Sequence, residues 1–279
     1  EPPIQIKLFA DDCVVYTSIN NQEDQIKLND ALRSINEWCI RWGLKINRSK
    51  TNSVTFTNKT LPLHFTYFIG NAAITRADRV KYLGVTLTSN LSWETHVENV
   101  CSGALKKLSF LKRKLRNTPP TLKLKAYKAL VRPKLEYADI IWSPWQQYLI
   151  KKIERVQNLA LRFIYSAYSR QHSVTNLCNR ASLQILEQRR IISRLKFVYQ
   201  LDHGDFKLSR ERYLQQPSKL SARTNHNKTF RQPPSHINAH KFALFPRAIF
   251  HWNALPAEVV NAASTASFTQ QIEKINFTI

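Results

Sequence analysis

The sequence predicts an α+β protein, with a small antiparallel sheet and one helix first and a mainly helical region after them. Near the N-terminus apolar side chains alternate with polar ones, which is typical of a half-buried strand. From about residue 90 apolar side chains recur at steps of four and three, which is typical of amphipathic helices. The charge changes at the same place, because residues 1–100 carry 11 basic and 10 acidic side chains and residues 101–279 carry 31 and 9. We therefore expect domains at residues 1–90, 91–170 and 171–279.

The first residues predict an antiparallel β-hairpin at 4–17. Residues 4–8 alternate in polarity, Phe9-Ala10-Asp11-Asp12 follows, and Cys13–Thr17 is a second β-prone run. Asp11 is then expected at the tip of the hairpin. One edge of the hairpin should lack its partner strand, because we expect the upstream strands to be missing.

A helix at Gln25–Trp42 should lie behind the hairpin, with Gly43 as its left-handed cap. Its apolar stripe is formed by Leu28, Leu32, Ile35, Cys39 and Trp42. Short extended segments are expected at 44–47 and 53–56, and strands near Leu63–Phe68 and Tyr82–Leu87.

The helical region should begin at Ser92, a plausible N-cap. Apolar spacing predicts a long helix stopped by Pro119-Pro120, a shorter one ended by Pro133 and a third at Gln147–Tyr165. Their buried positions are expected to be Val97, Cys101, Ala104, Leu108, Leu111, Leu115, Leu124, Tyr127, Val131, Ile150, Ile153, Val156, Ala160 and Phe163. Further helices are expected at Ser182–Leu201 and Ser267–Ile275, with order near Phe242–Ile249, Trp252 and Leu255, and the polar stretch 203–240 should be a linker.

A net charge of +23 usually means a polyanionic partner, and we expect nucleic acid. An anionic membrane surface or simple solubility are the alternatives. No apolar run reaches the roughly 18 residues that span a bilayer, so we expect no membrane segment. The four cysteines have no zinc-binding spacing and should be reduced thiols. The chain contains no Met, which suggests that the sequence begins inside a longer reading frame.

Adjacent Asp11 and Asp12 at a hairpin tip could bind a divalent cation. Mg²⁺ prefers hard oxygen ligands, and two neighbouring carboxylates repel each other unless a cation joins them. Asp-Asp is also a common pair in ordinary turns, so the dipeptide alone does not identify a metal site.

Phe9–Asp12, Trp42–Thr51 and Val80–Leu87 follow one another in an order and at a spacing that resemble the motifs of LINE-type (non-LTR, Jockey-like) retrotransposon reverse transcriptases. Phe9–Asp12 resembles the (F/Y)-x-D-D box, or motif C, of the palm, and Trp42–Thr51 resembles motif D. Val80–Leu87, with Trp93 and His96 behind it, resembles the primer grip, motif E. The resemblance continues in Tyr127–Pro133, Leu135–Ala138 and Trp252-Asn253-Ala254-Leu255-Pro256 with Phe268, so that it covers nearly the whole chain.

The resemblance implies a partial palm followed by a helical thumb and a C-terminal region. Asp11 would be a direct metal ligand and Asp12 the second, looser acid of a two-metal Mg²⁺ site. Phe9 and Ala10 would shape the hairpin beside the primer terminus. Lys50 would protonate or screen the leaving pyrophosphate, although Lys is also the commonest solvent-facing loop residue.

Three further residues would contact nucleic acid in such an enzyme. Gly84 would permit close approach to the primer, and an ordinary bulge glycine is the alternative. Tyr82 and Leu83 are as readily core as contact residues. Asn47 should fix the motif D loop through hydrogen bonds from its side chain to the backbone.

A basic face on and after the long helix should contact phosphates. Its residues are Lys106, Lys112, Arg113, Lys114 and Arg116. Arg189, Arg190, Arg194 and Lys196 form a second basic cluster. A solvated helix face is the alternative for either cluster, and Lys112–Lys114 also resembles a weak nuclear-import patch.

The expected function is therefore that of a fragment of an RNA-directed DNA polymerase. Its partners would be an RNA template, a DNA primer or target and, in the full-length enzyme, dNTP. The motif A Asp, the fingers and the endonuclease of the family have no counterpart here, so the chain alone should be inactive. The alternative is a non-catalytic RNA- or DNA-binding module from a truncated or domesticated element. The location would be intracellular, in the nucleus or in a cytoplasmic ribonucleoprotein.

Overall fold

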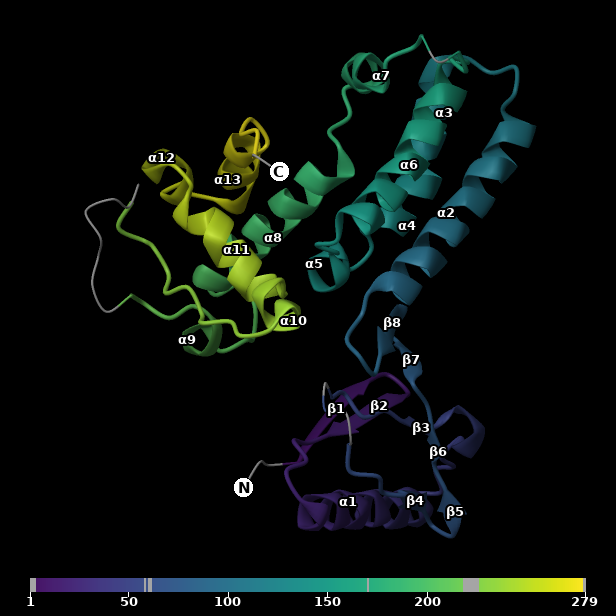
Figure 1. The fold of residues 1–279 in the computed structure, drawn as a ribbon, viewed down its shortest axis with the longest axis vertical. Helices are drawn as coiled ribbons and strands as arrows, with labels where there is room; N and C mark the ends of the chain where they lie inside the picture. Colours follow the sequence, from purple (N-terminus) through teal and green to yellow (C-terminus); the bar gives the residue numbers. More distant parts are fainter. Residues whose placement is uncertain (1–3, 58, 60–61, 170, 218–225, 278–279) are drawn as a thin grey trace. The chain divides into compact units, whose positions relative to one another are not determined.

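A computed structural model describes residues 4–57, 59, 62–169, 171–217 and 226–277 (Figure 1). The chain divides into two compact units, Glu1–Ser92 and Trp93–Ile279. The mixed composition of helices and small sheets agrees with the expected α+β class. The further division at residue 170 stays a prediction.

The first unit combines short strands with one long helix. Its strands are β1 (Gln5–Phe9), β2 (Asp12–Tyr16), β3 (Asn52–Ser53), β4 (Phe68–Ile69), β5 (Ala72–Ala73), β6 (Thr75–Arg76), β7 (Arg79–Tyr82) and β8 (Val85–Thr88). They form four separate pairs, β1-β2, β4-β5 and β7-β8 antiparallel and β3-β6 parallel. The expected small antiparallel sheet is thus a set of two-stranded ribbons.

Helix α1 (Gln22–Arg41) has well-formed ends. Asn21 and Asp24 make a capping box at its start, each side chain accepting a hydrogen bond from the other's backbone N–H. At its end Gly43 has φ +67°, and its N–H donates to the Ile40 carbonyl while that of Leu44 donates to Cys39. This is a Schellman motif, so the expected left-handed glycine cap is confirmed.

The apolar stripe of α1 is only partly covered. Leu28, Leu32, Ile35 and Cys39 are half-buried, and the Trp42 side chain is 67% exposed. The buried residues of the helix are instead Asp24 and Gln25 at its first turn. The helix packs on β4 through a different face, where the Phe68 N–H donates to the Asn29 side chain at 2.8 Å.

Two expected strands of the first unit also differ. Residues 62–67 have no regular structure, and β4 begins only at Phe68. The expected strand Tyr82–Leu87 is the hairpin β7-β8, because Leu83 and Gly84 adopt left-handed φ values of +45° and +81° and form its turn. Residues 44–47 and 54–57 are irregular, with only β3 extended and paired nearby.

The second unit is helical. Its elements are α2 (Glu94–Lys114), α3 (Pro120–Ala126), the π-helical segment η2 (Tyr127–Val131), α4 (Arg132–Glu136), α5 (Asp139–Trp142), α6 (Gln147–Ile164), α7 (Val174–Ala181), α8 (Leu186–Asp202), α9 (Arg210–Tyr213), α10 (Asn238–Lys241), α11 (Leu244–Asn253), α12 (Ala257–Val260) and α13 (Thr265–Ile272). Of the buried positions expected on the first three helices, all are buried except Leu115 and Leu124, which are half-buried. Trp93, not Ser92, is the N-cap of α2.

The prolines act differently from the expectation. Helix α2 ends at Lys114, before Pro119, and Pro120 starts α3 at a position where no amide hydrogen is needed. Pro133 does not end the next helix. Pro133 has no N–H to donate, and it lies just after the π-helical segment η2. The wider turn of η2 precedes α4, in which the helix continues through Pro133.

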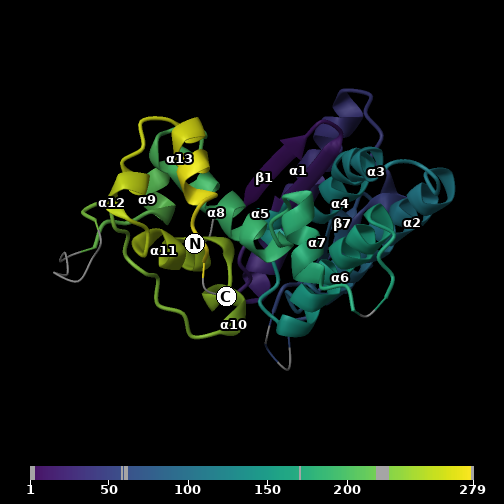
Figure 2. The ribbon, with the colours of Figure 1, turned by 90° about the horizontal axis from the view of Figure 1, so that it is seen from above.

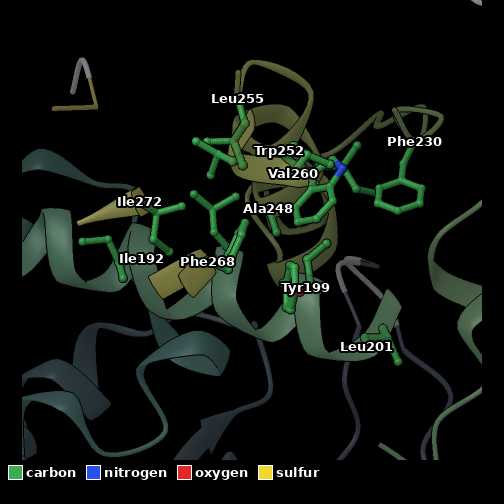
Figure 3. Packing of buried hydrophobic residues seen from close by; sticks show 14 of the residues in the cluster. Ile192, Tyr199, Leu201, Phe230, Ala248, Trp252, Leu255, Val260, Phe268 and Ile272 are labelled. Carbon is green, nitrogen blue, oxygen red and sulfur yellow. The ribbon is translucent and has the colours of Figure 1, made fainter. Parts of the chain in front are cut away.

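The last helices share a core around Trp252 (Figure 3). In the view from above, α11, α12 and α13 gather beside α8, while α2, α4 and α6 lie together at the other side of α8 (Figure 2). We expected residues 203–240 to be a linker, but the parts of this stretch that the structure describes pack on the core. Leu214 and Phe230 are buried in it, and the Trp252 indole donates a hydrogen bond to the Lys228 carbonyl at 2.8 Å. Its residues 218–225 lie outside the described residues.

Candidate functional site

The hairpin tip presents its two carboxylates to solvent. Strands β1 and β2 pair from Gln5 with Tyr16 up to Phe9 with Asp12, which leaves Ala10 and Asp11 as a two-residue turn. Asp11 and Asp12 are both exposed. Ala10 has φ +47°, a left-handed conformation that costs an L-residue about 1 kcal/mol or more. The predicted hairpin with Asp11 at its tip is confirmed.

The tip fits part of a Mg²⁺ site. Asp11 and Asp12 offer adjacent hard oxygen donors, and Mg²⁺ is often held by one or two carboxylates together with water and substrate phosphates. Within the residues that the structure describes, no group of three His, Cys, Asp or Glu side chains could hold a metal ion. The donor set present here therefore suits a metal that other ligands also hold.

Lys50 ends a short 3-10 turn, η1 (Arg48–Lys50). The Asn47 side chain caps this turn, accepting from the Lys50 N–H at 3.3 Å and from the Ser49 hydroxyl at 2.8 Å. The expected role of Asn47 in fixing the loop is confirmed. The Lys50 side chain is exposed, and no ion pair joins it to Asp11 or Asp12 among the described residues.

Tyr82, Leu83 and Gly84 lie at the tip of the β7-β8 hairpin. Tyr82 pairs with Val85, and the two residues between them form the turn. The Gly84 position is exposed, while Tyr82 and Leu83 are half-buried. Gly84 is therefore a turn glycine. Its left-handed φ, and not a bulge, explains the residue type.

The basic residues on and just after α2 are exposed as expected, with the exception of Lys112. Lys106, Arg113, Lys114 and Arg116 are exposed, and Lys112 is half-buried. The opposite face of the same helix, from Val97 to Leu111, is buried. These cations can therefore meet a polyanion without disturbing the core.

Two residues of the second basic cluster, Arg190 and Arg194, are buried, which corrects the expectation of a basic surface there. Arg190 and Arg194 on α8 are each 1% exposed. Arg194 donates to the Ser143 hydroxyl at 2.9 Å, and the Arg190 guanidinium lies 3.8 Å from the Glu154 carboxylate. Burial lowers the pKa of the Arg194 guanidinium well below its ordinary value, with Arg247 and Arg190 adding to the effect. These arginines join helices inside the unit.

Sequence reasoning missed two cations of α6. Helices α2 and α6 pack against each other, and a groove of about 670 Å³ lies between them. Lys152 and Arg155 of α6 line it together with Lys106 and Arg113 of α2. The seven-residue spacing of Lys106 and Arg113 places both on one face of α2, but nothing in the sequence shows that α6 lies alongside.

None of the described helices is both long and apolar enough to cross a membrane.

Residues 3–87 match a protein family described as "Reverse transcriptase (RNA-dependent DNA polymerase)". The chain is 32% identical over 162 residues to the probable RNA-directed DNA polymerase from transposon X-element of Drosophila melanogaster, which covers 56% of this chain and 18% of that protein. It is 29% identical over 171 residues to the RNA-directed DNA polymerase from mobile element jockey of Drosophila funebris, covering 60% and 19%. The match thus spans less than a fifth of these relatives. No solved structure is significantly similar to this chain.

Proposed function

Because residues 3–87 belong to the reverse transcriptase family and the chain is related to polymerases of LINE-type elements, we propose that it is part of an RNA-directed DNA polymerase. The observation that carries the proposal is the exposed Asp11-Asp12 pair at a two-residue turn, inside the segment that matches the family. A rigid hairpin that projects two carboxylates is the form of support that a metal-dependent nucleotidyl transfer needs.

Asp11 and Asp12 would hold the catalytic Mg²⁺, Asp11 as the direct ligand and Asp12 as the looser one. When bound, two such ions activate the primer hydroxyl and neutralise charge on the triphosphate. The turn residue Ala10 sets the direction of both carboxylates. Lys50 would lie by the leaving pyrophosphate, where its ammonium group screens negative charge. The Asn47 cap supports this proposal, because it holds the backbone that carries Lys50.

The other named residues would hold the nucleic acid. The side chain of Phe9 is 62% exposed beside the acidic tip, where it could contact a primer terminus. The β7-β8 turn at Tyr82–Gly84 would approach the primer with little side-chain bulk at Gly84. In this proposal residues 1–90 are the palm remnant and 91–170 the thumb, whose α2 cations contact the phosphates of template and primer.

A non-catalytic nucleic-acid-binding module is the second candidate. It is favoured by one observation, namely that no third carboxylate or other metal ligand joins Asp11 and Asp12 among the described residues. The same observation leads us to expect no primer extension by the 279-residue chain on its own. Binding of RNA and DNA would persist in either case, because it depends on the basic face and not on the acidic tip.

A chimera distinguishes the two candidates. The chain would replace the matching segment of the X-element polymerase, and dNTP incorporation on an RNA template would be measured. If the chain is part of a polymerase, the chimera should incorporate dNTP, and Asp11→Asn should abolish incorporation. Asp30 is an exposed acid on α1, and Asp30→Asn should leave incorporation unchanged. A chimera that folds and binds template–primer but incorporates no dNTP would favour the binding module.

A further inference from the structure

The groove between α2 and α6 has a strongly basic rim. Lys106 and Arg113 stand on the α2 side and Lys152 and Arg155 on the α6 side. Glu98 is the acidic residue of the lining, and it pairs with Lys152 at 2.6 Å. In the described part of the chain no ion pair engages the other three cations, so they are available to an anionic ligand.

Apolar and hydroxyl side chains line the groove together with the cations. Leu105 is 37% exposed and Leu159 is half-buried, so both offer apolar surface to a ligand. Ser102 and Ser109 are small residues on the same face of α2, and they leave room between the rims while offering hydroxyl donors. A ligand that fits must therefore carry negative charge along its edges and apolar surface between them.

The length and chemistry of the groove restrict the ligand further. Helices α2 and α6 run in the same direction (Figure 1). From Glu98 to Arg113 the groove follows α2 for about 22 Å at 1.5 Å per residue. The bases of a single strand are free to lie on apolar surface, whereas those of a duplex are paired and stacked inside it. A single strand can therefore contact both the cations and the apolar side chains of this groove, and a duplex can contact only the cations, through its phosphates.

We propose that the α2/α6 groove binds single-stranded RNA or DNA, with phosphates on Lys106, Arg113 and Arg155 and with sugars and bases over Leu105 and Leu159. The inference rests on the nucleic-acid partner proposed above and adds a separate single-strand path to it. Such a groove recognises the backbone and has little sequence preference. The Glu98–Lys152 pair lies at the end of the groove opposite Arg113.

The test compares two double variants that remove the same charge from the same helices. Lys106→Ala/Arg155→Ala removes two cations that line the groove. Lys107→Ala/Lys151→Ala removes two exposed cations that do not line it. Binding of a fluorescent oligo-dT and of a hairpin duplex to the 279-residue chain would be measured by anisotropy across a salt series, with circular dichroism to confirm that each variant folds.

The groove variant should bind oligo-dT about tenfold more weakly or worse, since hydrogen bonds to charged groups are the strong ones. Its log–log salt slope should be flatter by about 1.4, or about 0.7 for each lost phosphate contact. The control variant should change much less. Duplex binding should also fall less than oligo-dT binding, because Lys112 and Lys114 lie outside the groove and still contact duplex phosphates. Equal losses in both variants, or equal losses for oligo-dT and duplex, would overturn the groove assignment while leaving nucleic-acid binding intact. A wild-type chain that binds neither ligand would overturn the proposed nucleic-acid partner as well.

Discussion

In the Arg190→Ala variant the second unit should unfold more easily than in the wild type. This loss of stability should not depend on nucleic acid. The guanidinium is 1% exposed and lies 3.8 Å from Glu154 on α6. The Glu154 carboxylate also accepts the backbone N–H groups of Leu186 and Glu187, at 3.1 and 2.7 Å, and so caps the start of α8. Removing the arginine leaves this carboxylate largely buried without its cation.

Loss of one partner of a buried pair costs about 3–5 kcal/mol. For a unit of this size each kcal/mol lowers the melting temperature by roughly 2–4 °C, so we expect a decrease of about 6–20 °C. Thermal unfolding followed by circular dichroism measures it. Arg113→Ala removes the same charge from an exposed site and should change stability by no more than about 0.5 kcal/mol. If Arg190→Ala melts like the wild type and instead loses nucleic-acid affinity, then α8 carries a binding surface. The interpretation that Arg190 stabilises the packing of α8 would be wrong.

Three other perturbations have definite expected outcomes. Ala10→Gly should stabilise the first unit by about 0.5–1 kcal/mol in urea titrations, because glycine adopts the left-handed turn without strain, and an unchanged or lower midpoint would contradict the turn geometry. The triple variant Lys112→Ala/Arg113→Ala/Lys114→Ala should weaken duplex binding for every sequence alike and flatten its salt slope by about two to three, and an unchanged slope would leave these residues as a solvated helix face. Burial lowers the pKa of His96 to about 4 from 6.5, so its contribution to stability is present above pH 6.5 and is lost as the pH falls toward 4. His96→Gln should therefore flatten the pH dependence of unfolding free energy in that window by about 1.4 kcal/mol per pH unit, and identical slopes would show that the buried ring does not titrate as inferred.

Local signals predicted local structure well. The alternation before Asp11 produced the hairpin, Gly43 ended α1 in the predicted conformation, and Asn47 caps its own loop. In each case the residues that decide the structure are neighbours in sequence. Gly84 was placed in a strand but lies in a turn, because a turn and a bulge need the same left-handed glycine.

Burial that depends on residues far away in the sequence could not be predicted. Arg190 and Arg194 look like surface cations in sequence, and only the packing of α8 against α5 and α6 shows that they are internal. Phe230 sits in a polar stretch, yet its ring packs 5.6 Å from that of Trp252. Trp42 is the converse, since it continues an apolar stripe but its side chain is 67% exposed.

The central claim is that the Asp11-Asp12 tip is a divalent-metal site, and paramagnetic broadening by Mn²⁺ tests it in the chain as it stands. Mn²⁺ prefers the same oxygen ligands as Mg²⁺ and weakens the NMR signals of nearby amides. Titration of the isotope-labelled chain should broaden the amides of Ala10–Cys13 first, and Asp11→Asn should remove the effect while Asp30→Asn does not. Broadening that begins at other exposed acids, or that survives in Asp11→Asn, would contradict the assignment of this hairpin as the metal-binding tip of a polymerase.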